Sequence, residues 1–148
     1  MQIRLANKND ATALVNFNQA MALETEGKEL DSQILRQGVE AVFQQSDRGF
    51  YVVAEEDGNI AGGLMITFEW SDWRNNWFWW IQSVYILPEF RGRKIYSLMY
   101  AFVKDLADKQ GNVCGFRLYV EHDNEKAQKV YQKLGMESSH YLMYEEML

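Results

Sequence analysis

The segment from Trp77 to Leu87 restricts the fold more than any other stretch, because it is apolar on both of its alternating faces. Its alternate positions form two apolar sets: Trp77, Trp79, Ile81 and Tyr85 on one side, and Phe78, Trp80, Val84 and Ile86 on the other. A strand with one face in water alternates polar and apolar residues, whereas a strand covered on both sides is apolar throughout. The segment therefore predicts a central strand with helices on both faces of its sheet.

Hydrophobic spacing and turn residues place the other elements around this strand. Further strands are expected at Ile3–Ala6, Phe50–Glu55, Ile60–Phe68 and 114–120, with residues 138–148 closing the sheet. Helices are expected after a capping Asp10, after Asp31 and Ser32, over 95–109, and from about Asn124 to Gly135. The Asp57-Gly58-Asn59 turn is typical of a hairpin and implies antiparallel pairing. The expected fold is α/β, with a mixed, mostly antiparallel sheet and helices on both faces.

Composition limits the domain count and the partners. A chain of 148 residues with no linker-like tract predicts one domain, 1–148. The net charge of −6 disfavours nucleic acid as a partner and favours cationic small molecules. No apolar run is long enough to span a membrane, and the first residues do not resemble a signal peptide, so a cytoplasmic location is expected. The lone Cys114 is interpreted as a buried structural residue, and no metal is expected.

A cluster of positive charge follows the central strand in this acidic chain. Arg91, Arg93 and Lys94 lie just before the helix expected from Ile95. Cations at a helix N-terminus oppose the helix dipole, and a bound anion removes that conflict. The cluster therefore predicts a phosphate site, although a solvated set of surface charges is the alternative.

The order of elements, together with SVYILPEFRGRKIYSLMY and LYVEHDNEKAQKVYQKLGM, resembles the Gcn5-related N-acetyltransferase (GNAT) family over nearly the whole chain. The resemblance implies that the turn holds the coenzyme A diphosphate on its backbone amides. The implied cofactor-binding residues of the turn are Arg91, Gly92, Arg93, Lys94, Ile95, Tyr96 and Ser97. Lys94 and Tyr96 stand where the family usually has small residues. We expect the Lys94 N–H to donate if its backbone is helical, while Tyr96 either packs away from the ligand or lies along the pantetheine arm.

The second motif, Asn124-x-x-Ala127-x-x-x-Tyr131-x-x-x-Gly135, is similar to a later helix of that family. The resemblance implies that Asn124 contacts the pantetheine region and that Tyr131 protonates the departing thiolate. A phenol is protonated at neutral pH and suits this role. Without the motif, a core aromatic is the favoured interpretation of Tyr131, because Ala127 and Leu134 share its helical face, and the motif reverses that order.

The resemblance implies direct attack of a neutral amine on acetyl-CoA, with the oxyanion held by an amide among Val84, Tyr85 and Ile86. An amine is mostly protonated at neutral pH, so a base must take its proton. Glu69 and Glu24 are the first candidates, followed by Glu121 and His122. For each of these the alternative is a solvated surface charge.

Trp70 and Trp73 lie in a polar loop that, in the family, borders the acceptor site. They are candidate acceptor-binding residues that form an aromatic wall for an amine. A role in the core or in a dimer contact is the alternative.

Taken together, the sequence predicts an N-acetyltransferase that moves an acetyl group from acetyl-CoA to a primary amine of a small, cationic acceptor. One alternative is an acyl-CoA sensor of the same fold with weak catalysis. Another is a protein-interaction domain that uses exposed tryptophans. Homodimerisation is left open.

Overall fold

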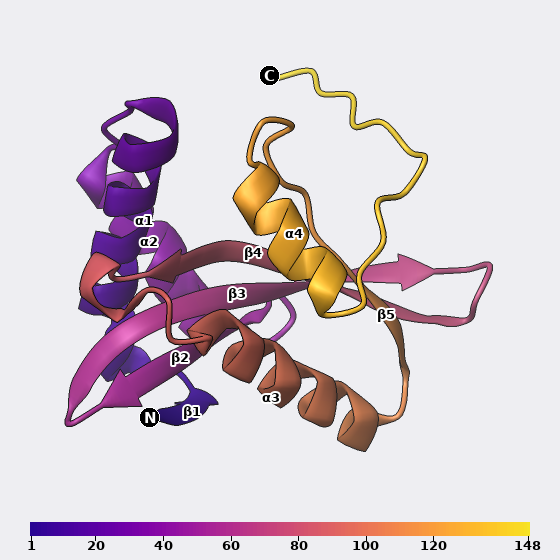
Figure 1. Ribbon diagram of the computed structural model, residues 1–148, viewed down its shortest axis with the longest axis horizontal. Coiled ribbons are helices and arrows are strands. Elements are labelled where there is room, and N and C mark those ends of the chain that lie inside the picture. Colours follow the sequence, from indigo (N-terminus) through magenta and orange to yellow (C-terminus); the bar gives the residue numbers. More distant parts are fainter. The chain divides into compact units, whose positions relative to one another are not determined.

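The computed structural model describes all residues, 1–148, and they divide into two compact units, 1–118 and 119–148 (Figure 1). The first unit contains five strands and three α-helices: β1 (Gln2–Leu5), α1 (Ala11–Glu26), α2 (Ser32–Gln44), β2 (Phe50–Glu56), β3 (Asn59–Ser71), β4 (Asn76–Ile86), α3 (Ile95–Gln110) and β5 (Val113–Arg117). Short 3-10 helices lie at Lys8–Asp10 and Pro88–Phe90. The second unit contains α4 (Glu125–Lys133).

The sheet has the order β1-β2-β3-β4-β5. Its first three pairs are antiparallel, and only β4 and β5 are parallel. Asp57 and Gly58 both have positive φ, 51° and 79°, which is the backbone of a tight hairpin turn between β2 and β3. The mixed, mostly antiparallel sheet and the hairpin are thus confirmed.

Helices cover both faces of the sheet, as predicted. The pair α1 and α2 packs on one face and α3 on the other (Figure 1). Adjacent residues of β2 show the separation, since Val53 belongs to the core with Leu14 and Phe17 of α1. Val52 points to the opposite face, and Met99 of α3 is fully buried.

Two aspartates precede helices, and they behave differently. Asp31 caps α2 as expected, because its carboxylate accepts hydrogen bonds from the N–H groups of Gln33 and Ile34. Asp10 precedes α1 but does not cap it with its side chain. That buried carboxylate accepts two hydrogen bonds from Arg4, at 2.8 and 3.0 Å, and one from the N–H of Asn7. The expectation that Asp10 caps α1 is therefore wrong: the ion pair with β1 uses the carboxylate instead.

A β-bulge interrupts β4 near its end. The pairing with β3 shifts by one residue between Met65–Gln82 and Gly63–Tyr85, and Ser83 has a φ of 53°. One extra residue reverses the alternation of side chains. Trp79 therefore packs against Phe50 and Phe68 on the α3 face, whereas Tyr85 packs against Phe17 of α1. The prediction that Trp79 and Tyr85 share a face is wrong, because strict alternation assumes a strand without a bulge.

The same strand separates from its parallel neighbour. Pairing between β4 and β5 ends at Trp80 and Arg117, while β4 continues to Ile86. β5 is therefore shorter than the predicted strand at 114–120. Residues 81–86 have no partner strand on this side, so their outward backbone groups remain open.

Two further expectations fail. Cys114 is exposed rather than buried, because it lies at an irregular position of the edge strand β5. Residues 138–148 form no strand, so the expectation that they close the sheet is wrong. None of the helices is long and apolar enough to cross a membrane.

Candidate functional site

The turn between β4 and α3 has an unusual backbone. Gly92 has a φ of 80°, and Lys94, which directly precedes α3, has a φ of 59° and a ψ of 30°. These are left-handed conformations, which cost a residue with a side chain about 1–2 kcal/mol but are freely available to glycine. The helical φ that was the condition for donation by the Lys94 N–H is therefore not present. The lysine instead adopts the conformation that the family's usual glycine favours.

The N–H groups of this turn are largely unpaired. No side chain caps α3, and its first turn contains no acidic residue. The backbone hydrogen bonds of the segment join Arg91 N to Pro88 O, at 3.2 Å, and Leu98 N to Lys94 O, at 3.1 Å. The N–H groups of Gly92 and Arg93 have no hydrogen-bond partner. Those of Ile95 and Ser97, in the first turn of α3, have none either. Several donors at the positive end of a helix dipole form a site suited to a phosphate group.

The two arginines of the turn are paired with carboxylates. Arg91 donates from Nε to the carbonyl oxygen of Ile86, at 2.9 Å, and forms an ion pair with Glu24 at 3.2 Å. Arg93 makes two hydrogen bonds to Glu56, at 2.7 and 3.1 Å. Each ion pair ties the turn to another element, α1 in one case and β2 in the other. Both arginines therefore have carboxylate partners on elements outside the turn.

Lys94 is the cation of the turn that forms no ion pair. The turn contributes three positive charges, and Glu24 and Glu56 balance two of them. The remaining charge is that of Lys94, an exposed side chain next to the unpaired N–H groups. An anion here would meet backbone donors first and the lysine ammonium second.

The predicted oxyanion-binding segment lies at the end of β4, next to this turn. Val84, Tyr85 and Ile86 follow the bulge, on the edge that β5 leaves unpaired. The Tyr85 hydroxyl donates to the Glu24 carboxylate at 3.2 Å. Burial and the negative charge of Glu24 raise the pKa of Tyr85. The structure thus brings together three groups predicted separately: the basic turn, the end of β4 and Glu24.

Glu69 lies elsewhere on the sheet, where β4 and β5 part. Its carboxylate accepts hydrogen bonds from Trp80 Nε1, at 2.9 Å, and from Arg117 Nη1, at 2.7 Å. The hydrogen bond from Trp80 and the Arg117 guanidinium hold the pKa of Glu69 below its usual range. A lower pKa makes the carboxylate a weaker proton acceptor near neutral pH.

Trp70 and Trp73 are not near the basic turn. Trp70 packs edge-on against Trp77 at the start of β4, and Trp73 lies in the hairpin turn with 88% of its surface exposed. At about 3.3 Å per residue, β4 places this turn about 30 Å from Ile86. The acceptor-binding role of these two tryptophans remains a prediction, and their distance from the basic turn does not support it.

The second unit carries the other predicted catalytic groups. The Asn124 side chain accepts a hydrogen bond from Ala127 N at 3.2 Å and so caps α4. Burial raises the pKa of Tyr131, which keeps its phenol protonated. Glu121 and His122 are exposed. No group of three or more His, Cys, Asp or Glu side chains is arranged to bind a metal ion.

Three residues that shape this site were missed by sequence reasoning. Glu56 and Arg117 neutralise charged residues that lie 37 and 48 positions away in the chain. Ser83 provides the bulge with a left-handed backbone. No local pattern marks any of them, because a long-range ion pair and a single bulged residue leave no periodic signal.

Comparisons with known proteins agree with this geometry. The model of the acetyltransferase (GNAT) family matches residues 16–136, a range that includes both motifs. The chain belongs to this family. The GNAT protein is similar to an "Uncharacterized N-acetyltransferase YhfO" of Bacillus subtilis (strain 168), with 26% identity over 141 residues, 93% of this chain and 90% of the relative.

Solved structures extend the comparison. A "possible acetyltransferase" from Clostridium difficile 630 is 41% identical, with a TM-score of 0.92, covering 99% of the GNAT protein and 97% of that chain. A "predicted acetyltransferase with acetyl-CoA" from Clostridium acetobutylicum has a TM-score of 0.80 and 20% identity. The match covers 98% of the GNAT protein and 95% of that chain. Family membership supports acetyltransferase activity with acetyl-CoA as the co-substrate.

Proposed function

We propose that this protein is an N-acetyltransferase that moves the acetyl group of acetyl-CoA to a primary amine of a small, cationic acceptor by direct attack, with residues 1–148 acting as one catalytic domain. The observation that carries the proposal is the uncapped turn before α3, with its unpaired N–H groups beside the open edge of β4. These two features offer a phosphate site and an amide-lined strand edge next to each other. The cationic acceptor is supported by the net charge of −6.

In this proposal the turn residues 91–97 bind the diphosphate through backbone N–H groups, and the Lys94 ammonium adds charge. The unpaired edge at residues 84–86 of β4 holds the pantetheine arm, and one of its amides donates to the thioester oxygen. That amide would stabilise the oxyanion when the amine nitrogen attacks the carbonyl carbon. Asn124 would contribute to the pantetheine region as the family motif implies.

The amine nitrogen forms the new C–N bond, and the C–S bond of the tetrahedral intermediate then breaks. Tyr131 supplies a proton to the departing thiolate, and the raised pKa of this tyrosine keeps the proton available at neutral pH. The proton lost by the amine passes to a carboxylate. We prefer Glu24 to Glu69 for that step, because Glu24 lies beside Tyr85 and the basic turn.

The test is acetyl-CoA turnover, measured as free thiol release, against amines, amino acids, polyamines and short peptides. Calorimetry of coenzyme A binding runs in parallel. Binding together with amine-dependent thiol release is the expected result. Absence of coenzyme binding would refute the phosphate-site assignment, and release that does not depend on the amine would refute transfer to an amine.

An acyl-CoA sensor is the second candidate, and one observation favours it. Both carboxylates proposed as bases are already engaged, Glu24 with Arg91 and Tyr85, and Glu69 with Arg117 and Trp80. A sensor would bind coenzyme A and release no thiol with any amine.

To identify which carboxylate acts as the base, Glu24→Gln and Glu69→Gln are compared by the pH profile of kcat/KM. We expect only Glu24→Gln to remove the limb that rises with pH.

A further inference from the structure

The Glu24 carboxylate is held by two donors from different elements. The Tyr85 hydroxyl donates to Oε1 at 3.2 Å, while Arg91 Nη2 lies 3.2 Å from Oε2 and 3.5 Å from Oε1. Glu24 lies in the last turn of α1, whereas Tyr85 belongs to β4 and Arg91 to the turn that precedes α3. Three elements therefore meet at one carboxylate.

The two donors differ in how firmly they are held. Tyr85 is buried, and its ring packs against Phe17 of α1, with the ring centres 5.5 Å apart. Burial raises the pKa of Tyr85, so its hydroxyl keeps the proton that it donates. The side chains of Arg91 and Glu24 are each nearly half exposed, at 47% and 42%. Exposed ion pairs contribute little stability, so the contact with Arg91 is the one that is readily exchanged.

The guanidinium of Arg91 has one nitrogen to spare. Its Nε donates to the carbonyl oxygen of Ile86 at 2.9 Å and its Nη2 to Glu24, whereas its Nη1 makes no hydrogen bond. A guanidinium binds phosphate best through two neighbouring nitrogens. Because Nε is engaged, that contact needs both Nη1 and Nη2, and Nη2 must then leave the carboxylate. Arg93 differs, since both of its Nη atoms bind Glu56, at 2.7 and 3.1 Å.

We propose that Arg91 moves from Glu24 to the diphosphate when coenzyme A binds, and that Tyr85 is a positioning residue that holds the Glu24 carboxylate in place. After the exchange Oε1 still accepts the hydrogen bond from Tyr85, while Oε2 is open. The open oxygen receives the proton that the amine loses when the C–N bond forms. Coenzyme binding and the availability of the base are therefore coupled.

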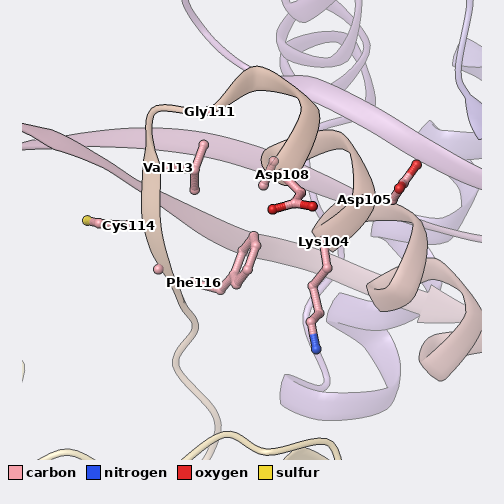
Figure 2. A pocket seen from close by; sticks show the side chains of 9 residues that line it. Lys104, Asp105, Asp108, Gly111, Val113, Cys114 and Phe116 are labelled. Atoms are coloured by element: carbon pink, nitrogen blue, oxygen red, sulfur yellow. The ribbon is translucent and has the colours of Figure 1, made fainter.

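Asp108 provides a matched carboxylate far from this cluster. It belongs to the last turns of α3, where it lines a hollow of about 560 Å³ against β5 (Figure 2). At about 1.5 Å per residue, it lies about 20 Å along α3 from Ile95, the residue at which the helix leaves the turn. Asp108→Asn therefore makes the same change of charge as Glu24→Gln without removing a partner of Arg91.

Calorimetric titration with coenzyme A tests the exchange without any turnover. We expect Glu24→Gln to bind coenzyme A about twofold to fivefold more tightly than the unmodified protein, because no ion pair has to be broken. Added to Arg91→Ala, the same substitution should change the affinity by less than about 1.5-fold, and Asp108→Asn should do the same in either chain. Weaker binding in Glu24→Gln, or equal tightening with and without Arg91, would overturn the exchange.

Tyr85→Phe tests the positioning role, because it removes the hydroxyl and keeps the ring that packs on Phe17. The assay uses the amine that gives the highest thiol release with the unmodified protein. We expect kcat to fall about tenfold and the Kd for coenzyme A to stay within about twofold. The double variant with Glu24→Gln should be no slower than Glu24→Gln alone, because both changes disable one carboxylate. An unchanged kcat in Tyr85→Phe, or losses that multiply in the double variant, would overturn this role.

The inference rests on the proposed function, because it takes Glu24 as the base, yet the two fail in different ways. If no amine releases thiol from the unmodified protein, the proposed function fails together with the role of Tyr85, and the calorimetric comparison still decides the exchange of Arg91. If acetyl transfer occurs and the effect of Glu24→Gln on affinity does not depend on Arg91, the function stands and the exchange is wrong.

Discussion

Lys94 contributes both a strained left-handed backbone and a positive charge, and two substitutions separate the effects of the two. Lys94→Gly relieves about 1–2 kcal/mol of backbone strain and gives the unfolded chain about 0.5–1 kcal/mol of additional entropy. The expected net result is a free energy of unfolding higher by about 0.5–1 kcal/mol, which corresponds to about 1–4 °C in Tm for a chain of this size. Lys94→Ala is the matched control, because it also removes the ammonium but keeps the strained φ of 59°.

The two variants should behave alike in coenzyme binding and differently in stability. Both lose the one cation of the turn that has no carboxylate partner, so both should bind coenzyme A about threefold to tenfold more weakly, as expected for an exposed charge-assisted contact. Denaturant unfolding measures the stability, and calorimetric titration measures the affinity. Equal stability of the glycine and alanine variants would refute the strain argument. Unchanged affinity in both would show that Lys94 does not contact the ligand.

Three further predictions concern the motifs and the N-terminal ion pair. Tyr131→Phe should lower kcat at least tenfold and leave the Kd for coenzyme A within twofold, because it removes a proton donor and little contact area; an unchanged kcat in thiol-release assays would exclude the role. Arg91→Ala should weaken coenzyme binding severalfold and Glu24→Gln should not, because the carboxylate competes with phosphate for that arginine. Weaker calorimetric binding in Glu24→Gln would instead show that their ion pair positions the turn. Asp10→Asn should lower the free energy of unfolding by about 1–3 kcal/mol, because it removes the closer of the two carboxylate partners of Arg4 and leaves only the longer ion pair with Glu55. Burial alone would raise the pKa of Asp10, but the hydrogen bonds from Arg4 and Asn7 lower it. The stabilisation is therefore complete above the ordinary carboxyl pKa and is lost as pH falls through the lower folded value. In urea unfolding the difference from the unmodified protein should disappear at acid pH, and a difference that persists there would contradict the ion-pair explanation.

The predicted strands and helices rest on local patterns, and most of them were confirmed. Asp57-Gly58 predicted the hairpin because this pair readily takes the two positive φ angles of the turn. The apolar run around Trp79 predicted a covered central strand, and Trp79 is 98% buried, with 2% of its surface exposed. Periodicity failed beyond Ser83, where a single bulged residue reverses the faces of the strand.

The candidate site was predictable only in part. The basic turn and its phosphate chemistry follow from charge next to a helix start, and these are local features. The partners of Arg91 and Arg93 were not predictable, because Glu24 and Glu56 lie far away in the chain and meet the turn only after folding. The same holds for Glu69, whose pKa depends on Trp80 and Arg117.

The sequence by itself determined the order of elements and the position of the cationic turn, because both depend on consecutive residues. Tertiary structure alone decided that Lys94 takes a left-handed backbone and that two of the three cations are neutralised. It also decided that β4 parts from β5 after Trp80. These features depend on strand register and on pairs distant in the chain, and local spacing carries no information about either.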